Sequence, residues 1–356
     1  MSKILYVASN MTHINNFHTG YIAELRRLGH TVSVMARGEG ADYDVPFEKK
    51  LFSPKNTACR RKIREILKKE CFDTVILNTT LAAFHVRFAL PRGARPRVIN
   101  IVHGYLFSKN VGFLKRTLLL LCERLVAKKT DEIIVMNAED EAIAKRHRLA
   151  TRGVSSVDGF GVSVRDSITP PDLIKKEYGS DRYSLLFVGE LSARKNQAFL
   201  IKSLPAIIER VPNAVLWLVG DGAERERLEA LAKETGVGER VVFLGKRVDA
   251  CDFMRAADLY VTAASIEGLP FNVVEALGTG RYVVASDVKG NSDVISSTRV
   301  GLLYPFDDTG AFVSAVSTAY SERRDGGDAA RERYAFFEKS RVFPKVLQTL
   351  VYLIEK

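Results

Sequence analysis

The sequence is poor in cysteine, and its four cysteines are scattered along the chain. Cys59, Cys71, Cys122 and Cys251 form no Cys-x-x-Cys pair, and none lies at metal-binding spacing from a histidine. A disulfide framework and a cysteine-based zinc site are therefore disfavoured as the basis of the fold. Reduced thiols in a cytosolic protein are expected instead.

Long apolar runs and nucleotide fingerprints are also missing. No stretch approaches the ~18 consecutive apolar residues of a membrane-spanning helix. The first residues, MSKILYVASN, are too short and too polar for a signal peptide and predict a strand. No GxGxxG opens a helix after that strand, and GFG at 159–161 and GTG at 278–280 lack the flanking elements. Dinucleotide and Walker-type sites are thus disfavoured, and we expect a chain that is soluble or lies on a membrane surface.

Strands and helices alternate along both halves of the 356 residues, of which 46% are hydrophobic. Apolar runs such as KILYVAS, DTVILN, SLLFVGEL and AVLWLVGDG alternate with helical patterns, and a break with Pro170 and Pro171 falls near 163–182. This pattern predicts an α/β protein of two doubly wound, Rossmann-like domains, at 1–165 and 166–325. We expect the helical segment 326–356 to pack back on the first domain. Ligands of such sheets bind beyond the strands' carboxyl ends, here in a cleft between the facing domains.

The net charge of +11 belongs to the first half of the chain. Residues 1–165 hold 28 Lys and Arg against 15 Asp and Glu, which leaves 25 against 27 for the remainder. This asymmetry predicts an anionic partner for the first domain: lipid headgroups, a phosphorylated substrate or nucleic acid.

Three strand-end loops of the second half carry candidate donor-binding residues. In VGELSARKNQ, Gly189 lets backbone approach a ligand, and Arg194 and Lys195 precede a helix that Asn196 is expected to cap. Two cations beside helix amides suit a diphosphate, although a solvated basic loop explains the pattern equally well. Gly220 in VGDG and Arg247 in LGKRVD are weaker candidates, because a plain turn and a surface arginine are the ordinary alternatives.

The fourth loop is SIEGLPFNVVEALGTG, residues 265–280, with two glutamates in apolar surroundings. Pro270 is expected in the first turn of a helix that ends near Gly278. The helix would offer amides to an anion from Phe271, Asn272 and Val273. Glu267 precedes the helix and Glu275 lies about one turn in, and a carboxylate can accept hydrogen bonds from two neighbouring sugar hydroxyls. Two surface glutamates are the alternative, weakened by the apolar neighbours.

In the first half, two strand ends carry polar residues. HINNFH, 13–18, is expected as a ligand loop after the first strand, with Asn15, Asn16 and His18 as candidates for donor or acceptor contacts. His103 ends another strand, before a glycine, where a functional role is more frequent than for an isolated histidine.

Together these motifs resemble a known family. VGELSARKN, GDG and the spacing of Glu267 and Glu275 in SIEGLPFNVVEALGTGRYVVASD, within 183–304, resemble the group 1 retaining glycosyltransferases (family 4), which have the GT-B fold. NNFHTGYIAELRRLGHTV, VHGYLF and VKGNSDVI resemble its bacterial capsule, exopolysaccharide and O-antigen branch. The usual Gly-Gly loop after the first strand is replaced by SNMTHINNFHTG.

The resemblance implies a role for each matching position. Arg194 and Lys195 would hold the donor diphosphate, and Glu275 would bind the ribose. Glu267 would face the donor sugar, and His103 would lie near the reacting carbon. The implied catalytic residues are His103, Glu267, Arg194 and Lys195, and the other donor contacts are Gly189, Gly220, Arg247, Phe271, Asn272, Val273 and Glu275. No metal and no cofactor are expected, and the preferred co-substrate is a UDP-sugar.

Two basic stretches of the first half predict contact with anionic lipid. RRKIREILKK, 60–69, and YLFSKNVGFLKRTLLLLCERLVAKK, 105–129, mix apolar and basic residues. Alternatively, Leu118–Leu121 belong to a core helix and the lysines to its solvated face, with the membrane contact confined to 105–116. A polyprenyl-diphosphate-linked saccharide would explain a basic acceptor domain. We therefore expect a cytoplasmic enzyme, peripheral at the inner face of the cell membrane.

Two rival functions remain open at this point. An epimerase or hydrolase of the same fold would act on a nucleotide sugar without an acceptor. A nucleic-acid-binding protein would explain the charge, but the sequence has no basic strand interleaved with aromatics and no recognition motif.

Overall fold

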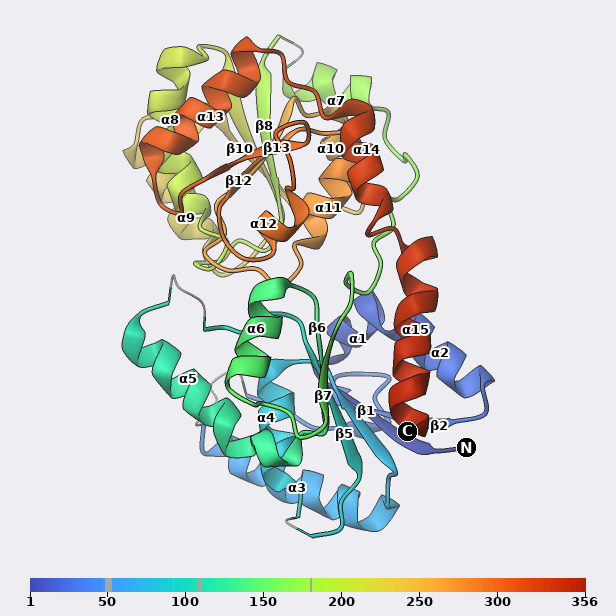
Figure 1. Cartoon of the computed structure of the whole chain (residues 1–356). Coiled ribbons are helices and arrows are strands. Elements are labelled where there is room, and N and C mark those ends of the chain that lie inside the picture. The colour runs from blue at the N-terminus through green and yellow to red at the C-terminus, as the bar shows by residue number, and fades with distance from the viewer. Residues whose placement is uncertain (49–52, 92, 108–110, 180) are drawn as a thin grey trace. The chain divides into compact units, whose positions relative to one another are not determined.

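The computed structural model describes residues 1–48, 53–91, 93–107, 111–179 and 181–356 (Figure 1). The chain divides into two compact units, unit 1 with Met1–Gly161 and Lys339–Lys356, and unit 2 with Val162–Glu338. Each unit is built around its own parallel sheet, so the predicted fold class of two Rossmann-like domains is confirmed. No helix within the described ranges combines the length and the apolar composition needed to cross a bilayer.

Unit 1 contains a seven-stranded parallel sheet in the order β3-β2-β1-β4-β5-β6-β7. Its strands are β1 (Lys3–Asn10), β2 (Thr31–Arg37), β3 (Tyr43–Asp44), β4 (Thr74–Leu77), β5 (Arg97–Val102), β6 (Glu132–Val135) and β7 (Gly153–Ser156). Its helices are α1 (Met11–Phe17), α2 (Thr19–Arg27), α3 (Lys55–Glu70), α4 (Thr80–Ala89), α5 (Phe113–Val126), α6 (Ala138–Arg146) and α15 (Lys339–Glu355), with a 3₁₀ turn at Ala127–Lys129. The central strands are continuous apolar runs because helices cover both faces.

Unit 2 contains a six-stranded parallel sheet in the order β10-β9-β8-β11-β12-β13. Its strands are β8 (Tyr183–Val188), β9 (Ala214–Val219), β10 (Val241–Gly245), β11 (Leu259–Thr262), β12 (Val283–Ser286) and β13 (Gly301–Tyr304). Its helices are α7 (Pro171–Tyr178), α8 (Gln197–Arg210), α9 (Arg225–Glu234), α10 (Ala250–Ala256), α11 (Phe271–Gly278), α12 (Asn291–Val294), α13 (Thr309–Ser321) and α14 (Gly327–Ala335), with a 3₁₀ turn at Gly238–Arg240. The strand order reverses between β8 and β11, as it does between β1 and β4 in unit 1, and such switch points are where doubly wound sheets bind ligands.

The C-terminal segment is divided between the two units, which join at Glu338 and Lys339 in the sequence. The sequence predicted instead that the whole segment 326–356 packs on the first domain. α14 packs against α11 of unit 2, and a Cβ on Gly278 would lie 2.8 Å from the Tyr334 ring. α15 packs against α2 of unit 1, where the rings of Tyr21 and Phe343 stack with centroids 4.3 Å apart. The expectation therefore applies to α15 and is wrong for α14.

A buried ion pair joins α4 and α5 in unit 1. The guanidinium of Arg87 is fully buried and donates to both carboxylate oxygens of Glu123 at 2.9 Å. Arg87 also donates to the carbonyl of Ala83 (3.0 Å) and to the hydroxyl of Thr130 (3.2 Å). Nearly all of the charge and donor capacity of this arginine is thus satisfied inside the unit.

Replacing Glu123 by alanine should strongly destabilise unit 1, because it leaves the Arg87 charge buried without its partner. Breaking such a pair costs about 3–5 kcal/mol. The matched control is Glu65→Ala, which removes the exposed Arg61–Glu65 pair of α3 (3.6 Å) and should change stability by less than about 1 kcal/mol. Urea unfolding followed by circular dichroism measures both, and equal losses for the two variants would contradict this account of the pair.

Candidate functional site

The switch point of unit 2 brings Lys195 and Glu267 together. The loop after β8 carries Lys195 and the loop after β11 carries Glu267, and the two strands are neighbours in the sheet. Lys195 Nζ donates to Glu267 Oε1 at 2.6 Å, with only 7% and 8% of the two residues exposed. The loops are also joined through Ser265, whose backbone N–H donates to the carbonyl of Arg194 at 2.9 Å.

Arg194 completes a cluster with one net positive charge. Its Nη1 donates to Glu267 Oε2 at 3.1 Å and to the Ile266 carbonyl at 3.1 Å, while 39% of the side chain stays exposed. The sequence predicted two cations for a diphosphate and a separate carboxylate for a sugar. The structure instead places the three charged groups in contact, so that each carboxylate oxygen is held by one cation and retains a further lone pair.

Close backbone packing explains the glycines around this cluster. The N–H of Gly189 donates to the Val219 carbonyl at 2.9 Å, and a Cβ on Gly220 (φ +137°) would lie 1.9 Å from the Gly189 carbonyl oxygen. A Cβ on Gly290 would lie 2.7 Å from the Gly268 carbonyl oxygen and 3.0 Å from Glu267 Cβ. Any side chain at Gly220 or Gly290 would therefore push the ligand-facing loops apart.

Helix α11 begins at Phe271, with Pro270 as the residue that precedes it. Asn272 Nδ2 donates to the carbonyl of Val188 at 2.5 Å and so ties the first turn to the end of β8. The amide of Val273 donates to the Pro270 carbonyl at 3.0 Å. This amide, which the sequence predicted to face the donor, is thus engaged within the helix.

Glu275 lies in a different environment from Glu267. Its side chain is half-buried on α11, and burial raises the pKa of its carboxyl to about 7, opposed by the charge of Arg165. Among the described residues, no hydrogen bond or ion pair holds this carboxylate. A partly buried carboxyl group without a protein partner is well suited to receive hydroxyl donors from a ligand.

Two other predicted residues, Arg247 and Asn196, lie in loops that follow or precede elements of unit 2. Arg247 donates from Nε and Nη2 to the two carboxylate oxygens of Asp249, both at 2.8 Å, which holds its guanidinium within its own loop. Asn196 occupies the predicted N-cap position of α8, but its backbone is left-handed (φ 56°) and its side chain makes no capping bond. Gln197, which the sequence did not single out, braces the loop by accepting from the Ser192 amide (3.2 Å) and donating to the Glu190 carbonyl (2.8 Å).

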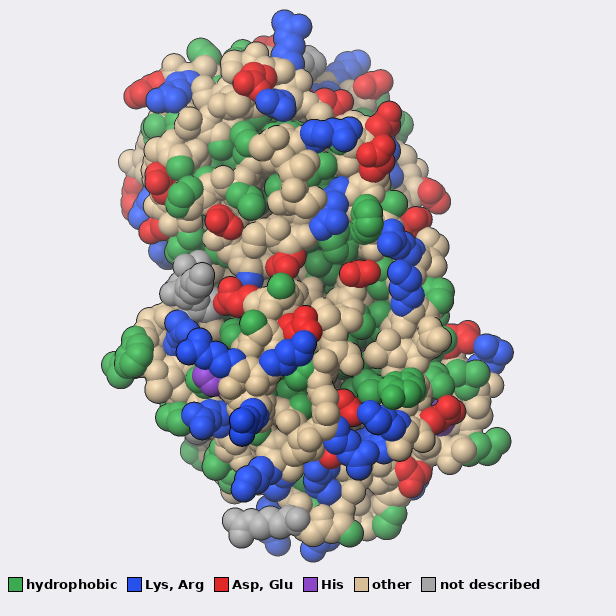
Figure 2. Space-filling model, viewed as in Figure 1, with side chains coloured by type: hydrophobic (Ala, Val, Ile, Leu, Met, Phe, Trp, Pro, Cys, Tyr) green, Lys and Arg blue, Asp and Glu red, His purple; other side chains and the backbone are tan. Residues whose placement is uncertain are grey.

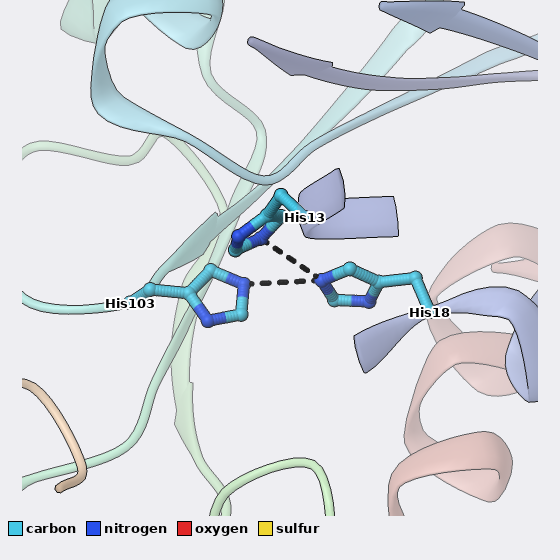
Figure 3. Close-up of side chains that lie close together, drawn as sticks. All are labelled: His13, His18 and His103. Carbon is cyan, nitrogen blue, oxygen red and sulfur yellow. Dashed lines mark hydrogen bonds between the residues drawn. The ribbon is translucent and has the colours of Figure 1, made fainter. Parts of the chain in front are cut away.

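In unit 1, three imidazoles gather at the carboxyl ends of β1 and β5 (Figure 3). His18 Nε2 lies 3.3 Å from both His13 Nε2 and His103 Nε2. Most of the predicted loop 13–18 belongs to the helix α1. Asn10 caps this helix, because its Oδ1 accepts a hydrogen bond from the His13 amide at 2.9 Å. His18 and His103 were predicted site residues, and the structure adds His13.

Burial keeps the three imidazoles neutral. It lowers the pKa of His13 to about 4 and holds the pKa values of His18 and His103 well below their usual range, with the neighbouring imidazoles adding to the effect. Asn15 and Asn16, the other predicted contacts of this segment, are exposed on α1 and take no part in the cluster.

Two parallel-sheet units of this kind are the architecture of the GT-B fold. Sequence-family models match the chain as "Glycosyl transferase 4-like domain" over residues 14–153 and as "Glycosyl transferases group 1" over residues 182–322. The chain belongs to the group 1 glycosyltransferases and is an enzyme of that class.

Individual proteins agree with this assignment. The chain is 26% identical over 333 residues to EpsD of Bacillus subtilis (strain 168), covering 89% of this chain and 87% of that protein. It is 28% identical over 260 residues to the Escherichia coli UDP-Gal:alpha-D-GlcNAc-diphosphoundecaprenol alpha-1,3-galactosyltransferase, covering 71% and 67%. The solved sucrose-phosphate synthase of Thermosynechococcus elongatus shares the fold over 100% of both chains, with a TM-score of 0.81 at 20% identity.

We expect one glutamate carboxyl of the ligand-free protein to titrate near pH 7 in ¹³C NMR spectra, because burial disfavours the charge of Glu275. The signal should vanish in Glu275→Gln and persist in Glu226→Gln, which alters an exposed residue of α9. Since folding raises this pKa, protonated Glu275 adds stability in acid that is lost as the pH rises through about 7. A midpoint for Glu275 near the ordinary value of about 4.3 would contradict the prediction.

Proposed function

We propose that the protein is a retaining glycosyltransferase of surface polysaccharide biosynthesis. In this proposal it moves a sugar from a UDP-sugar, bound by unit 2, to a saccharide on a lipid diphosphate, bound by unit 1. The observation that carries the proposal is the Arg194–Lys195–Glu267 cluster at the unit 2 switch point, beside Glu275 on the adjoining helix, whose carboxyl has no hydrogen-bond or ion-pair partner among the described residues.

The two cations are placed to neutralise a diphosphate. Lys195 uses one of its three N–H donors on Glu267, and Arg194 keeps part of its guanidinium exposed. Charge-assisted bonds from such partly desolvated groups are stronger than those from solvated ones. We propose that both side chains bind the donor diphosphate and stabilise the charge of the departing nucleotide, so that transfer requires no metal.

The two glutamates take separate tasks. The cations fix the Glu267 carboxylate in place before any ligand arrives, and its remaining lone pairs would accept from hydroxyls of the donor sugar. Glu275 would accept from the two ribose hydroxyls, whose donation favours its charged form. Glu267 would thus bind hydroxyl groups of the donor sugar, and we assign it no nucleophilic role.

The nature of donor and acceptor rests on the relatives. The Escherichia coli relative is named for UDP-Gal and for a GlcNAc-diphosphoundecaprenol acceptor. Another relative, 26% identical over 284 residues, is named as an O-antigen biosynthesis glycosyltransferase. Both names support a UDP-sugar and a lipid-linked saccharide, and an anionic acceptor agrees with the basic first half of the chain.

The surface of unit 1 supports contact with a membrane. Five apolar side chains of α5 are 48–84% exposed: Phe113, Leu114, Leu118, Leu121 and Leu125. The alternative that Leu118–Leu121 form a core helix is therefore wrong for Leu118 and Leu121, whereas Leu119 and Leu120 pack against the core. Figure 2 shows Lys and Arg side chains gathered over the region of α5 and α6. The predicted stretch 105–116 includes residues 108–110, which lie outside the described residues.

Transfer by the purified protein, assayed with UDP-sugars and lipid-linked saccharides, should fall at least about 100-fold in Lys195→Ala and in Glu275→Ala, a loss of ~2.7 kcal/mol in transition-state stabilisation. Lys202→Ala, on the exposed face of α8, is the matched control and should retain full activity. Full activity of both site variants would overturn the assignment. Product formed without any acceptor would favour an epimerase or hydrolase.

The double variant Phe113→Ser/Leu114→Ser should bind anionic vesicles several-fold more weakly than the wild-type chain in co-sedimentation, because it removes apolar surface beside Lys115 and Arg116. Leu173→Ser/Val248→Ser, which alters exposed apolar residues of unit 2, should bind like the wild type. Equal binding of all three proteins would remove α5 from the membrane contact.

A further inference from the structure

The three imidazoles of unit 1 have the spacing of metal ligands. Their closest ring nitrogens all lie within 4.8 Å of one another, and the two measured contacts of His18 Nε2 are 3.3 Å. Zinc–nitrogen bonds of ~2.0–2.1 Å at tetrahedral angles place two ligand nitrogens about 3.3 Å apart. Two of the three nitrogen–nitrogen distances thus match those of a tetrahedral zinc site, and the third lies within 4.8 Å.

The hydrogen-bonding capacity of the three imidazoles favours a cation between them. His18 Nδ1 lies 3.0 Å from the hydroxyl of Tyr6, and both residues are fully buried. If His18 Nδ1 carries the proton and donates to Tyr6, His18 Nε2 has a single lone pair that faces two other imidazoles. Hydrogen bonds would have to share that lone pair, whereas one cation would take a lone pair from each ring at once.

The surroundings suit a transition metal with imidazole ligands. Phe160 packs against His18 and His103, with ring centroids 4.9 and 5.3 Å away, and limits the movement of both rings. The half-buried positions of His13 and His103 leave an approach from solvent. Imidazole ligands disfavour Mg²⁺ and Ca²⁺, which prefer oxygen.

We propose that His13, His18 and His103 bind one Zn²⁺ through their Nε2 atoms. The Tyr6 hydroxyl accepts a hydrogen bond from the Nδ1–H of His18 and fixes its ring, and a fourth coordination position stays open to water or a ligand oxygen. The binding itself is independent of the sugar-transfer proposal.

The test uses the full-length chain with its purification tag removed and its metal stripped by a chelator. Titration with Zn²⁺ against a chromophoric chelator should show one ion per chain with a micromolar or tighter Kd. Co²⁺ in place of zinc should give the strong visible absorption of a tetrahedral site, without the near-ultraviolet band of cobalt–thiolate bonds, which excludes the four cysteines as ligands. Failure of the wild-type chain to bind one ion at micromolar concentration overturns the proposal.

Variants separate a metal site from a merely hydrogen-bonded cluster. His13→Ala and His103→Ala, at half-buried positions, should each weaken Zn²⁺ binding at least tenfold, and Tyr6→Phe should weaken it less. His147→Ala, outside the cluster at the end of α6, should bind like the wild type. Circular dichroism confirms that each variant is folded, and either histidine variant suffices if the other unfolds. Wild-type affinity in a folded His13→Ala or His103→Ala variant overturns the proposal.

Discussion

The ion pair between Lys195 and Glu267 is the constraint on which the arrangement of the unit 2 switch point depends. Two charges that are each more than nine-tenths buried are tolerated only when their partners are held in good geometry. The neighbouring strands β8 and β11, the Ser265–Arg194 bond and the glycine contacts at Gly290 all serve to hold the two loops at that distance. The neighbouring positions of β8 and β11 thus hold one cation and one carboxylate at a fixed distance from each other.

The two glutamates of unit 2 differ in the partners that compensate their burial. Glu267 is compensated by two cations, so its carboxylate is fixed before a ligand arrives. Glu275 has no such compensation among the described residues, and its pKa rises to about 7. A ligand that brings hydroxyl donors therefore gains most from Glu275, whereas Glu267 contributes through its fixed orientation. In the proposed nucleotide-sugar site, a preorganised Glu267 and a Glu275 completed by the ligand would together favour selective binding.

The sequence predicted the sheets well and the contacts within the site less well. Continuous apolar strands and the Glu267/Glu275 spacing are local signals, and they led to the two units and to the loops after β8 and β11. The short strand β7, with GVSS, has no apolar run and was not predicted. Lys195 contacts Glu267, which lies 72 residues further along the chain, and Gln197 donates to the carbonyl of Glu190, 7 residues before it. Both contacts depend on the directions in which the side chains point after folding. His13 joins His103 through folding of distant strands, which no local pattern encodes.

The stability of unit 1 and its surface are linked through α5. The inward face of this helix is anchored by Glu123, whose bidentate pair with Arg87 is buried, and by Leu119 and Leu120, which pack against the core. Because these contacts hold the helix, its outward face can carry exposed leucines that an isolated amphipathic helix would have to bury by itself. A specific ion pair is a suitable anchor here, since it fixes the rotation of the helix about its axis and hence which side chains point outward. In the proposed membrane contact, the basic charge of the first half of the chain would supply long-range attraction to anionic lipid, and the exposed apolar side chains of α5 would act at short range.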